Sequence, residues 1–337
     1  MENSDDKRVW IQFYSPNEIK NLELPPNLIL VGDAHIQRGA FCIIGGPPGV
    51  GKSRAAMALA ISGATENNWM DLPVKQKFKT MIIQTENGKS RLKRDFETLN
   101  CGGFEQWITI CSPPPFGLAF EQKDFIEELR KKIEEFKPDV VIFDPWNSIA
   151  GDDKQSDYLA AFKTIRSVVD VSDTGAAVVI VAHTRKPRDD EKASGRELIH
   201  LLSGSHVLVS VPRSVFVMVS ETSDVDDENV IWTCCKNNDG AMNAPTIWLK
   251  RDGLSFEYAG EHDPKEQTGK KRITITIEDV KKVLQIMPNG LPKKALFLML
   301  KKQTGASQAA CYAALDVEKG KFKDHIEETD GMLKWRD

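Results

Sequence analysis

The sequence has no uninterrupted apolar run that approaches the roughly 18 residues needed to span a membrane. Its first residues, Met-Glu-Asn-Ser-Asp-Asp, are acidic and contain no apolar stretch, so we expect no secretory signal and a cytoplasmic location. The six cysteines are scattered, with no C-x-x-C pair and no Cys/His spacing typical of a metal site. We therefore expect reduced cysteines in a reducing compartment and no structural zinc.

The chain also lacks a strong charge of one sign. Its formal net charge is −4, which gives no global argument for a nucleic-acid partner. Residues 260–337 hold 15 Lys and Arg against 12 Asp and Glu, a balance of +3, so residues 1–259 carry −7. This mild asymmetry permits a polyanionic partner without requiring one.

Short apolar runs alternate with amphipathic stretches over residues 1–259, and this alternation predicts an α/β domain. Several of the runs are apolar throughout, as expected for parallel strands covered by helices on both faces. We predict helices at 52–62, 89–99, 122–136 and 158–171. The predicted strands lie at 40–45, 80–85, 107–111, 140–144, 177–183, 214–220, 230–235 and 246–249. The last run of these strands is closely spaced and joined by polar turns, so we expect its strands to be antiparallel to one another.

A polar stretch at 260–272 has the composition of a linker and separates off a small domain at 273–337. Within that domain, the pattern predicts helices at 277–287, 292–304 and 307–318. A hairpin is expected around Asp330-Gly331, since Asp-Gly is a strong signal for a tight turn. Three helices closed by a hairpin are the pattern of a winged-helix-like domain.

A glycine-rich loop between the first predicted strand and helix matches G-x-x-x-x-G-K-[ST]. Such a loop turns its backbone N–H groups toward phosphate oxygens, and the helix N-terminus that follows adds partial positive charge. The lysine is expected to reach the β- and γ-phosphates of ATP. The predicted nucleotide-binding residues are Gly46, Pro47, Pro48, Gly49, Val50, Gly51, Lys52, Ser53 and Arg54.

A Mg²⁺ ion bound with ATP needs oxygen ligands from the protein. Ser53 would supply one oxygen, and Asp144, which follows four apolar residues, would supply a carboxylate in the layout of a Walker B strand. The alternative for Asp144 is an ordinary turn acid before Pro145.

Two further polar residues end predicted strands. Glu86 ends the strand after the P-loop helix, where a carboxylate faces the γ-phosphate and can deprotonate or orient water; the alternative is turn chemistry. His183 ends the 177–183 strand, where it can sense the γ-phosphate; the alternative is a structural histidine.

These motifs, in their order, resemble those of the RecA-like ATPases. They are Arg-Gly at 38–39, the loop at 45–53, Gln-Thr-Glu-Asn at 84–87, Val-Ile-Phe-Asp-Pro at 141–145, Val-Ala-His-Thr-Arg-Lys-Pro at 181–187 and Ser-Gly-Ser at 203–205. The likeness covers about residues 15–258 and is greatest to the RepA-type hexameric replicative helicases of plasmids and phages. It implies ATP hydrolysis between the subunits of a homo-oligomeric ring, with single-stranded DNA in the central channel.

In that family the segment after the sensor histidine contributes to the channel. Here the segment 184–203 contains five cations that would contact DNA phosphates, although it has no aromatic residue to stack on bases. A solvated surface loop is the alternative. The five cations are Arg185, Lys186, Arg188, Lys192 and Arg196.

RecA-like rings complete each site with a cation from the neighbouring subunit. Lys236 stands where relatives have a lysine followed two residues later by an arginine, but this chain has Asn238 at the second position. Arg213 is a second candidate, and either residue has a plain surface cation as its alternative. A cation supplied in this way, called a finger, speeds hydrolysis by orders of magnitude in other NTPases. Because neither Lys236 nor Arg213 matches the family pattern fully, the argument for a fast motor is weaker.

Three functions therefore compete. The first is a ring helicase or translocase on single-stranded DNA, and the second is a RecA-like ATPase that regulates or switches assembly without motor activity. A small-molecule kinase is the weakest, because no arginine-rich lid is evident. In the small domain, the 307–318 segment has no base-reading arginine, so protein docking or oligomerisation competes with duplex binding.

Overall fold

The structure is a computed structural model of the 337-residue chain. It describes residues 12–97, 103–149, 155–170, 175–185, 193–202, 206–220, 229–241, 245–263, 275–285, 290–306, 308–329 and 331–336. The chain divides into two compact units, Met1–His262 and Asp263–Asp337.

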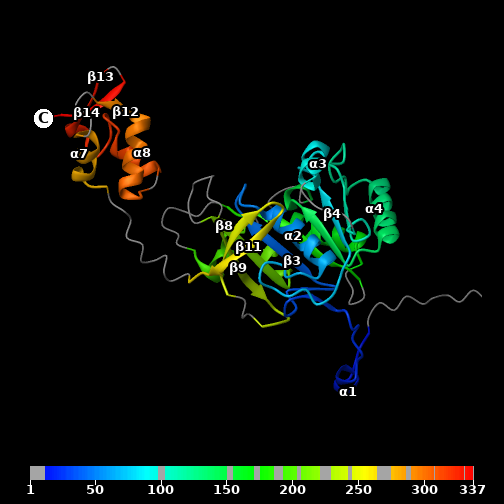
Figure 1. The fold of residues 1–337 in the computed structure, drawn as a ribbon. Coiled ribbons are helices and arrows are strands. Elements are labelled where there is room, and N and C mark those ends of the chain that lie inside the picture. Colours follow the sequence, from blue (N-terminus) through cyan, green and yellow to red (C-terminus); the bar gives the residue numbers. More distant parts are fainter. Residues whose placement is uncertain are drawn as a thin grey trace, which may run out of the picture. The chain divides into compact units, whose positions relative to one another are not determined.

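The larger unit is built on a nine-stranded sheet in the order β11-β10-β9-β8-β3-β7-β6-β4-β5 (Figure 1). The strands from β8 to β5 are parallel to one another, and β9, β10 and β11 extend the sheet in antiparallel fashion. Because the carboxyl ends of parallel strands share one edge, the loops that follow β3, β4, β6 and β7 meet there. The strands are β3 (Phe41–Gly46), β4 (Thr80–Gln84), β5 (Ile108–Ile110), β6 (Val140–Asp144), β7 (Ala177–His183), β8 (Ser214–Ser220), β9 (Asn229–Asn237), β10 (Ile247–Asp252) and β11 (Ser255–Glu261).

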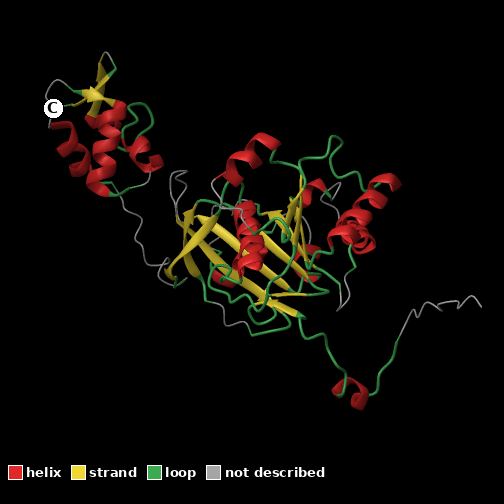
Figure 2. Ribbon diagram, turned by 45° about the vertical axis from the view of Figure 1, so that its right-hand side comes forward, coloured by secondary structure: helices red, strands yellow, loops and turns green. Residues whose placement is uncertain are grey.

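Helices cover both faces of this sheet (Figure 2). On one face lie α2 (Lys52–Thr65) and α3 (Lys89–Glu97), and on the other lie α4 (Lys123–Phe136) and α5 (Gln155–Val168). Shorter helical segments are η1 (Trp146–Ser148), η2 (Gly195–Leu201) and α6 (Val207–Ser210). No helix of the described residues is long and apolar enough to cross a membrane.

The two faces explain why the central strands are apolar without alternation. In β3, Ile44 packs with Leu59 of α2 in one core, whereas Ile43 packs with Phe162 and Ile165 of α5 in the other. Each such side chain contributes roughly 1.5–3 kcal/mol through burial, and replacing one with alanine costs about 2–5 kcal/mol. The predicted α/β fold with a mostly parallel sheet and helices on both faces is confirmed.

The antiparallel strands are joined to the α2 face by three aromatic residues. Trp69 meets Phe216 of β8 and Trp232 of β9 edge-on, both at 5.2 Å between ring centroids, and Phe216 stacks on Trp232 at 4.7 Å. The indole N–H of Trp69 donates to the Ala55 carbonyl of α2 at 3.0 Å. This cluster fixes α2, the helix after the glycine-rich loop, against strands far along the chain, since α2 ends at Thr65 and β8 begins at Ser214.

Arg38 has a structural role at the amino-terminal ends of the parallel strands. Its guanidinium forms an ion pair with Asp139, just before β6, and donates to the carbonyls of Gly175 at 3.1 Å and Asn27 at 3.2 Å. Because both charged side chains are largely buried, loss of either would leave an uncompensated charge.

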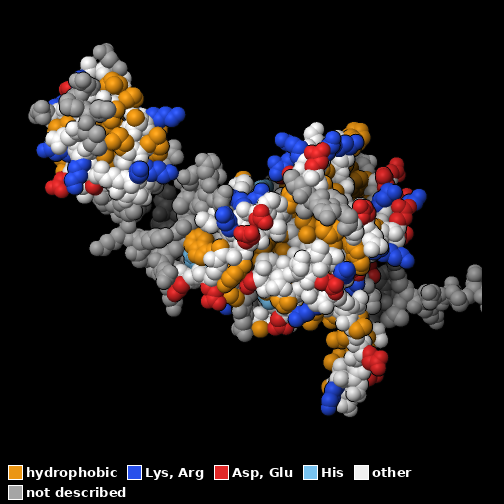
Figure 3. Space-filling model, in the orientation of Figure 1, with side chains coloured by type: hydrophobic (Ala, Val, Ile, Leu, Met, Phe, Trp, Pro, Cys, Tyr) orange, Lys and Arg blue, Asp and Glu red, His pale blue; other side chains and the backbone are white. Residues whose placement is uncertain are grey.

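Apolar side chains are exposed in the N-terminal segment that carries α1 (Pro16–Lys20) (Figure 3). Phe13 is 87% exposed, Ile19 and Leu24 are each 55% exposed, and no residue of α1 is buried. Ser15 and Glu18 nevertheless form a complete capping box. The helix is therefore specified locally without being packed on the sheet. The segment leads to the short hairpin of β1 (Ile29–Val31) and β2 (Ile36–Gln37).

The smaller unit contains α7 (Ile277–Gln285), α8 (Lys293–Thr304), α9 (Gln308–Ala314) and η4 (Lys323–His325). Its sheet has the order β12-β14-β13, with β12 (Leu291–Pro292), β13 (Ile326–Thr329) and β14 (Met332–Trp335). Three helices and a sheet ending in a hairpin form a winged-helix-like arrangement around Leu296, Leu300 and Leu333.

Several boundaries differ from those expected. Strand β11 (Ser255–Glu261) has no counterpart among the predicted strands, and the predicted domain end at residue 259 falls inside it. Gly260 and Glu261, which the polar composition places in the linker, belong to this strand. The antiparallel pairing expected among the last strands is found between β8 and β9 and between β9 and β10, and β8 also pairs in parallel with β3.

Candidate functional site

The glycine-rich loop connects β3 to the first turn of α2. Gly49 and Gly51 have positive φ values of 77° and 112°, which side-chain-bearing residues rarely adopt. A Cβ atom at Gly51 would lie 3.0 Å from Cζ of Phe256 in β11. Glycine is therefore required there for both backbone conformation and space, and the N-terminus of α2 faces the loop.

Lys52 is the first residue of α2 and is only 6% exposed. Its ammonium group donates to the Pro47 carbonyl at 2.9 Å and lies 3.3 Å from Nδ1 of His183. Burial lowers the pKa of Lys52 to about 8, against the opposing effects of Asp144 and Glu86. A phosphate group would restore the charge that burial disfavours.

Ser53 and Asp144 lie together between α2 and the end of β6. Both residues line the same cavity, and the Asp144 side chain is buried, with 6% of its residue surface exposed. Burial raises the pKa of Asp144 to about 6, and Glu86 adds to this shift, while Ser53 and Lys52 oppose it. A buried carboxylate beside a hydroxyl fits Mg²⁺, which prefers oxygen ligands and would compensate the buried charge.

Glu86 lies in the turn after β4 and lines the same cavity as Lys52 and Asp144. Strands β4 and β6 pair in parallel with Gln84 beside Asp144, so the turn projects from the same edge as the Walker B carboxylate. Glu86 is exposed and therefore accessible to water.

His183 ends β7, beside Gly46 of β3. An ammonium group can only donate, so Nδ1 of His183 accepts from Lys52 and the ring proton of the neutral imidazole lies on Nε2. Burial lowers the pKa of His183, and the charge of Lys52 lowers it further. The histidine is thus neutral and in direct contact with the phosphate-binding lysine.

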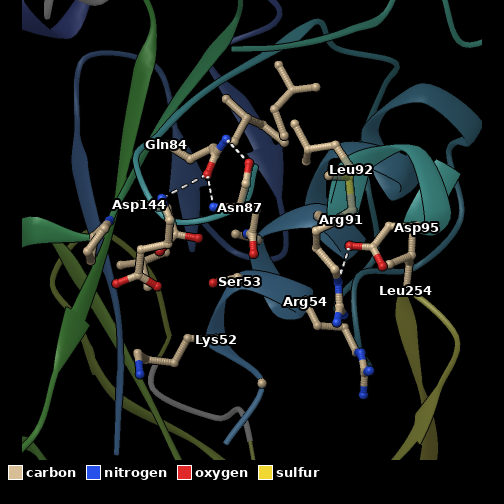
Figure 4. Close-up of a pocket in the computed structure, with 18 of the residues that line it drawn as sticks. Lys52, Ser53, Arg54, Gln84, Asn87, Arg91, Leu92, Asp95, Asp144 and Leu254 are labelled. Carbon is tan, nitrogen blue, oxygen red and sulfur yellow. Dashed lines mark hydrogen bonds and ion pairs between the residues drawn. The ribbon is translucent and has the colours of Figure 1, made fainter. Parts of the chain in front are cut away.

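These residues surround one cavity of about 670 Å³ (Figure 4). In Figure 4, Lys52 and Asp144 lie at one side, and Arg54, Arg91, Asp95 and Leu254 lie at the other. The first side is a phosphate end. Of the labelled residues on the second side, only Arg54 is predicted from the sequence. Apolar side chains that line the cavity include Met57, Ile82, Leu92, Ile110 and Leu254.

The β10–β11 hairpin closes this second side. Arg251 donates to the carbonyl of Val50 in the P-loop at 3.1 Å, and the guanidinium of Arg54 lies 5.9 Å from the Phe256 ring centroid. On α3, Arg91 pairs with Asp95 at 2.8 Å. Sequence reasoning missed Arg251, Leu254 and Phe256, since no motif marks them and only the folding back of the hairpin brings them to the loop.

Of the predicted DNA-contacting residues, Lys186, Arg188 and Lys192 lie outside the described residues, as do residues 203–205. Arg185 follows His183 by two positions, and its backbone N–H donates to Leu201 at 2.8 Å. Its guanidinium lies 3.4 Å from the carbonyl of His200. Arg196 is exposed on η2. The basic segment is therefore joined at both ends to the edge of the sheet where His183 lies.

Lys236 and Arg213 lie near the amino-terminal ends of the parallel strands, whereas the phosphate loop lies at the carboxyl ends. Arg213 precedes β8, which is parallel to β3, and Lys236 pairs with Val215 at the start of β8. At about 3.3 Å per residue along β8, the backbone of Arg213 lies roughly 17 Å and that of Lys236 roughly 10 Å from the level of Gly46, where the phosphate loop begins. Neither reaches the site of its own chain.

Both residues also have partners within the chain. The Lys236 ammonium donates to the carbonyls of Val209 and Pro212, each at 2.7 Å, and to Ser210 at 3.3 Å. Arg213 pairs with Asp239 at 3.3 Å. These contacts give Lys236 a capping role at the end of α6.

The parallel sheet, the P-loop at its edge and the carboxylates on neighbouring strands define a P-loop ATPase with a RecA-like fold. The chain belongs to the AAA_25 family, described as an AAA domain, whose model matches residues 11–189. Comparison with curated proteins gave no match.

Proposed function

We propose that the chain is a Mg-ATP-hydrolysing ring ATPase that acts as a helicase or translocase on single-stranded DNA, from a plasmid, phage or other mobile element. The observation that carries the proposal is the contact between Lys52 and His183, which links the phosphate site to the basic segment after β7. A resemblance to the RepA-type helicases supports the same assignment.

ATP binds with its phosphates in the loop at Gly46–Ser53 and its base toward Arg54, Arg91 and Leu254. The N–H groups at the start of α2 and the Lys52 ammonium hold the phosphate oxygens. The apolar wall around Leu92 and Leu254 receives the flat base, and the Arg54 guanidinium offers a stacking surface. The cavity of about 670 Å³ is large enough for a nucleotide.

Hydrolysis depends on Glu86 at the phosphate end. Its carboxylate accepts a proton from a water molecule as that water attacks the γ-phosphate in line with the leaving oxygen. Ser53 and Asp144 would hold Mg²⁺, which when bound neutralises charge on the β- and γ-phosphate oxygens.

His183 transmits the state of the site. Lys52 donates to Nδ1 of His183, and the γ-phosphate of a bound nucleotide would compete for the same ammonium group. Thr184 donates its backbone N–H to Gly46 at 3.1 Å, so a shift of the loop also moves the backbone that leads to Arg185. This connection is a physical path from the phosphate to the proposed DNA-contacting segment.

A homo-oligomeric ring, a hexamer as in the helicases it resembles, would place a cation from one subunit at the site of the next. Lys236 and Arg213 lie on the edge opposite Lys52, so a head-to-tail arrangement presents them to a neighbouring site. The exposed Phe13, Ile19 and Leu24 of the N-terminal segment supply apolar surface for contact with a second copy.

A regulatory or assembly-switching ATPase without motor activity is the second candidate. The engagement of Lys236 by three carbonyl oxygens favours it, because the ammonium group must leave all three to act in the next subunit. Asn238, where relatives have arginine, favours it as well.

ATP turnover with and without single-stranded DNA separates the two candidates. A DNA motor is expected to hydrolyse ATP at least several-fold faster with DNA, and Arg185→Ala/Lys186→Ala should lose that stimulation while keeping basal turnover. Turnover that ignores DNA, in a protein whose mass still changes with ATP, would support the regulatory candidate. A Glu86→Gln variant that hydrolyses ATP at the wild-type rate would contradict the catalytic assignment in both.

Subunit mixing tests the contribution from a neighbour. Lys236→Ala has an intact loop, and Lys52→Ala has an intact Lys236, so mixed rings contain some complete sites. Activity that appears only on mixing would identify Lys236 as the residue supplied in trans. The Arg213→Ala variant, mixed in the same way, tests the other candidate.

A further inference from the structure

Gln84 is a buried polar residue at the end of β4, only 1% exposed. Its side-chain oxygen accepts from the backbone N–H groups of Glu86 at 3.1 Å and Asn87 at 2.7 Å. Its amide nitrogen donates to the carbonyls of Asn87 at 2.9 Å and Cys111 at 2.8 Å. One side chain thus uses all four hydrogen-bonding positions of an amide.

These bonds join three parts of the chain. The Gln84 backbone belongs to β4, Glu86 and Asn87 form the turn after it, and Cys111 directly follows β5. Figure 4 shows Gln84 with its hydrogen bonds to the turn, above Asn87. The turn is held from its inner side by the amide, while the Glu86 side chain is left exposed to the cavity.

The bond to the Glu86 N–H fixes the backbone of the residue whose side chain must meet water. Glu86 is exposed, so burial does not restrain its side chain. A misplacement of about 1 Å at a reacting group costs on the order of 100-fold in rate. Restraint of the turn is therefore a requirement for catalysis and not only for folding.

We propose that Gln84 is the positioning residue for Glu86, acting through the turn backbone. The proposal rests on the proposed function, since it needs Glu86 to act in ATP hydrolysis. Gln84 also lines the cavity, but in this role it acts through the backbone of the turn. Its loss affects the chemical step more than nucleotide binding, because the P-loop and Lys52 are not among its partners.

The first test replaces Gln84 with methionine, which has a similar length and no hydrogen-bonding amide. We expect kcat to fall by about 10–100-fold, with KM and the affinity for a non-hydrolysable ATP analogue within about threefold of wild type. Gln76→Met is the matched control, because the Gln76 amide donates to the Asn27 carbonyl at 3.0 Å, away from the cavity. It should leave kcat unchanged.

A double-mutant cycle separates positioning from general stability. If Gln84 acts through Glu86, Gln84→Met should reduce the residual rate of Glu86→Gln by no more than about threefold, since neighbouring residues that act as a unit are not additive. Rates are measured per folded protein, well below the melting temperature of each variant. A fully additive loss, or a Gln84→Met variant with a lower melting temperature and a wild-type kcat, would overturn the proposal.

These measurements test the role of Gln84 separately from the role of Glu86 in hydrolysis. Wild-type hydrolysis that Glu86→Gln abolishes, together with a Gln84→Met variant of normal kcat, refutes only the role of Gln84. Absence of hydrolysis in the wild type, or full hydrolysis in Glu86→Gln, refutes the assignment of Glu86 and the positioning role with it.

Discussion

The ammonium group of Lys52 lies 3.3 Å from Nδ1 of His183 and so joins the phosphate-binding residue to the residue expected to sense phosphate. Lysine has three N–H donors, and two are used by His183 and Pro47. An incoming phosphate therefore takes the third donor or displaces one of these partners. In either case nucleotide binding changes the surroundings of His183 directly.

The lowered pKa of Lys52 predicts how nucleotide affinity depends on pH. In the free protein, burial holds this pKa at about 8, with Asp144 and Glu86 opposing the shift and His183 in contact. Above pH 8 the free protein must take up a proton to bind phosphate, so the Kd for a non-hydrolysable ATP analogue should rise by up to about tenfold per pH unit. Titrations from pH 7.5 to 9.5 measure this slope.

The Lys52→Arg variant is the control for this dependence. A guanidinium stays charged throughout the range, so the Kd of Lys52→Arg should remain flat, whatever its absolute value. A wild-type affinity that does not change between pH 7.5 and 9.5 would contradict the prediction.

Asp144→Asn should increase stability and abolish hydrolysis. The folded pKa of Asp144 is raised from 3.8 to about 6, so the native state binds more protons in that window and stability falls as pH rises through it. An uncharged amide removes this cost, and we expect about 1–3 kcal/mol of added stability at pH 7.5 in chelator. Thermal unfolding measures it.

With Mg²⁺ and nucleotide, the wild type should become more stable than Asp144→Asn. A bound cation compensates the Asp144 charge, so magnesium with nucleotide should stabilise the wild type more than Asp144→Asn. Hydrolysis by the variant should fall by at least about 100-fold. Equal stabilisation of the two proteins by Mg²⁺ would argue against Asp144 as a ligand.

Arg251→Ala should weaken nucleotide binding without affecting the chemical step. Its guanidinium bonds the Val50 carbonyl, and it lines the side of the cavity opposite Lys52. A bond from a charged donor contributes about 1.5–3 kcal/mol, which corresponds to a KM increase of about tenfold or more. The neighbouring Lys250→Ala, on the exposed side of β10, should keep the wild-type KM.

Lys236 and Arg213 should differ in their effect on stability. Lys236→Met removes bonds to three carbonyl oxygens and should cost about 1–3 kcal/mol. Arg213→Ala breaks a partly exposed ion pair and should cost less than about 1 kcal/mol. Denaturant unfolding compares the two, and a Lys236→Met variant as stable as wild type would exclude the capping role.

The phosphate end of the site is predictable because local pattern and topology agree there. Glu86, Asp144 and His183 each follow an apolar strand, and parallel strands bring such positions to one edge. The loop at Gly46–Ser53 is specified by its own glycines. No long-range contact has to be known for these residues to be placed together.

The opposite end depends on packing that no local pattern encodes. Arg251 and Phe256 reach the loop only because β10 and β11 fold back over α2, and β11 itself has too little apolar alternation to be recognised. Gln84 appears in the sequence as the polar end of a strand. Three of its side-chain hydrogen bonds are to the adjacent turn. The fourth depends on where the Cys111 carbonyl lies, which the pairing of β4 with β5 determines.

The return of the β10–β11 hairpin to the P-loop also sets the order in which the site is completed as the chain is made. The glycine-rich loop emerges from the ribosome some two hundred residues before Arg251 and Phe256. A nascent chain that ends at residue 189, where the family match ends, has the phosphate loop but not the strands that close it. The smallest fragment expected to retain ATP therefore extends to Glu261.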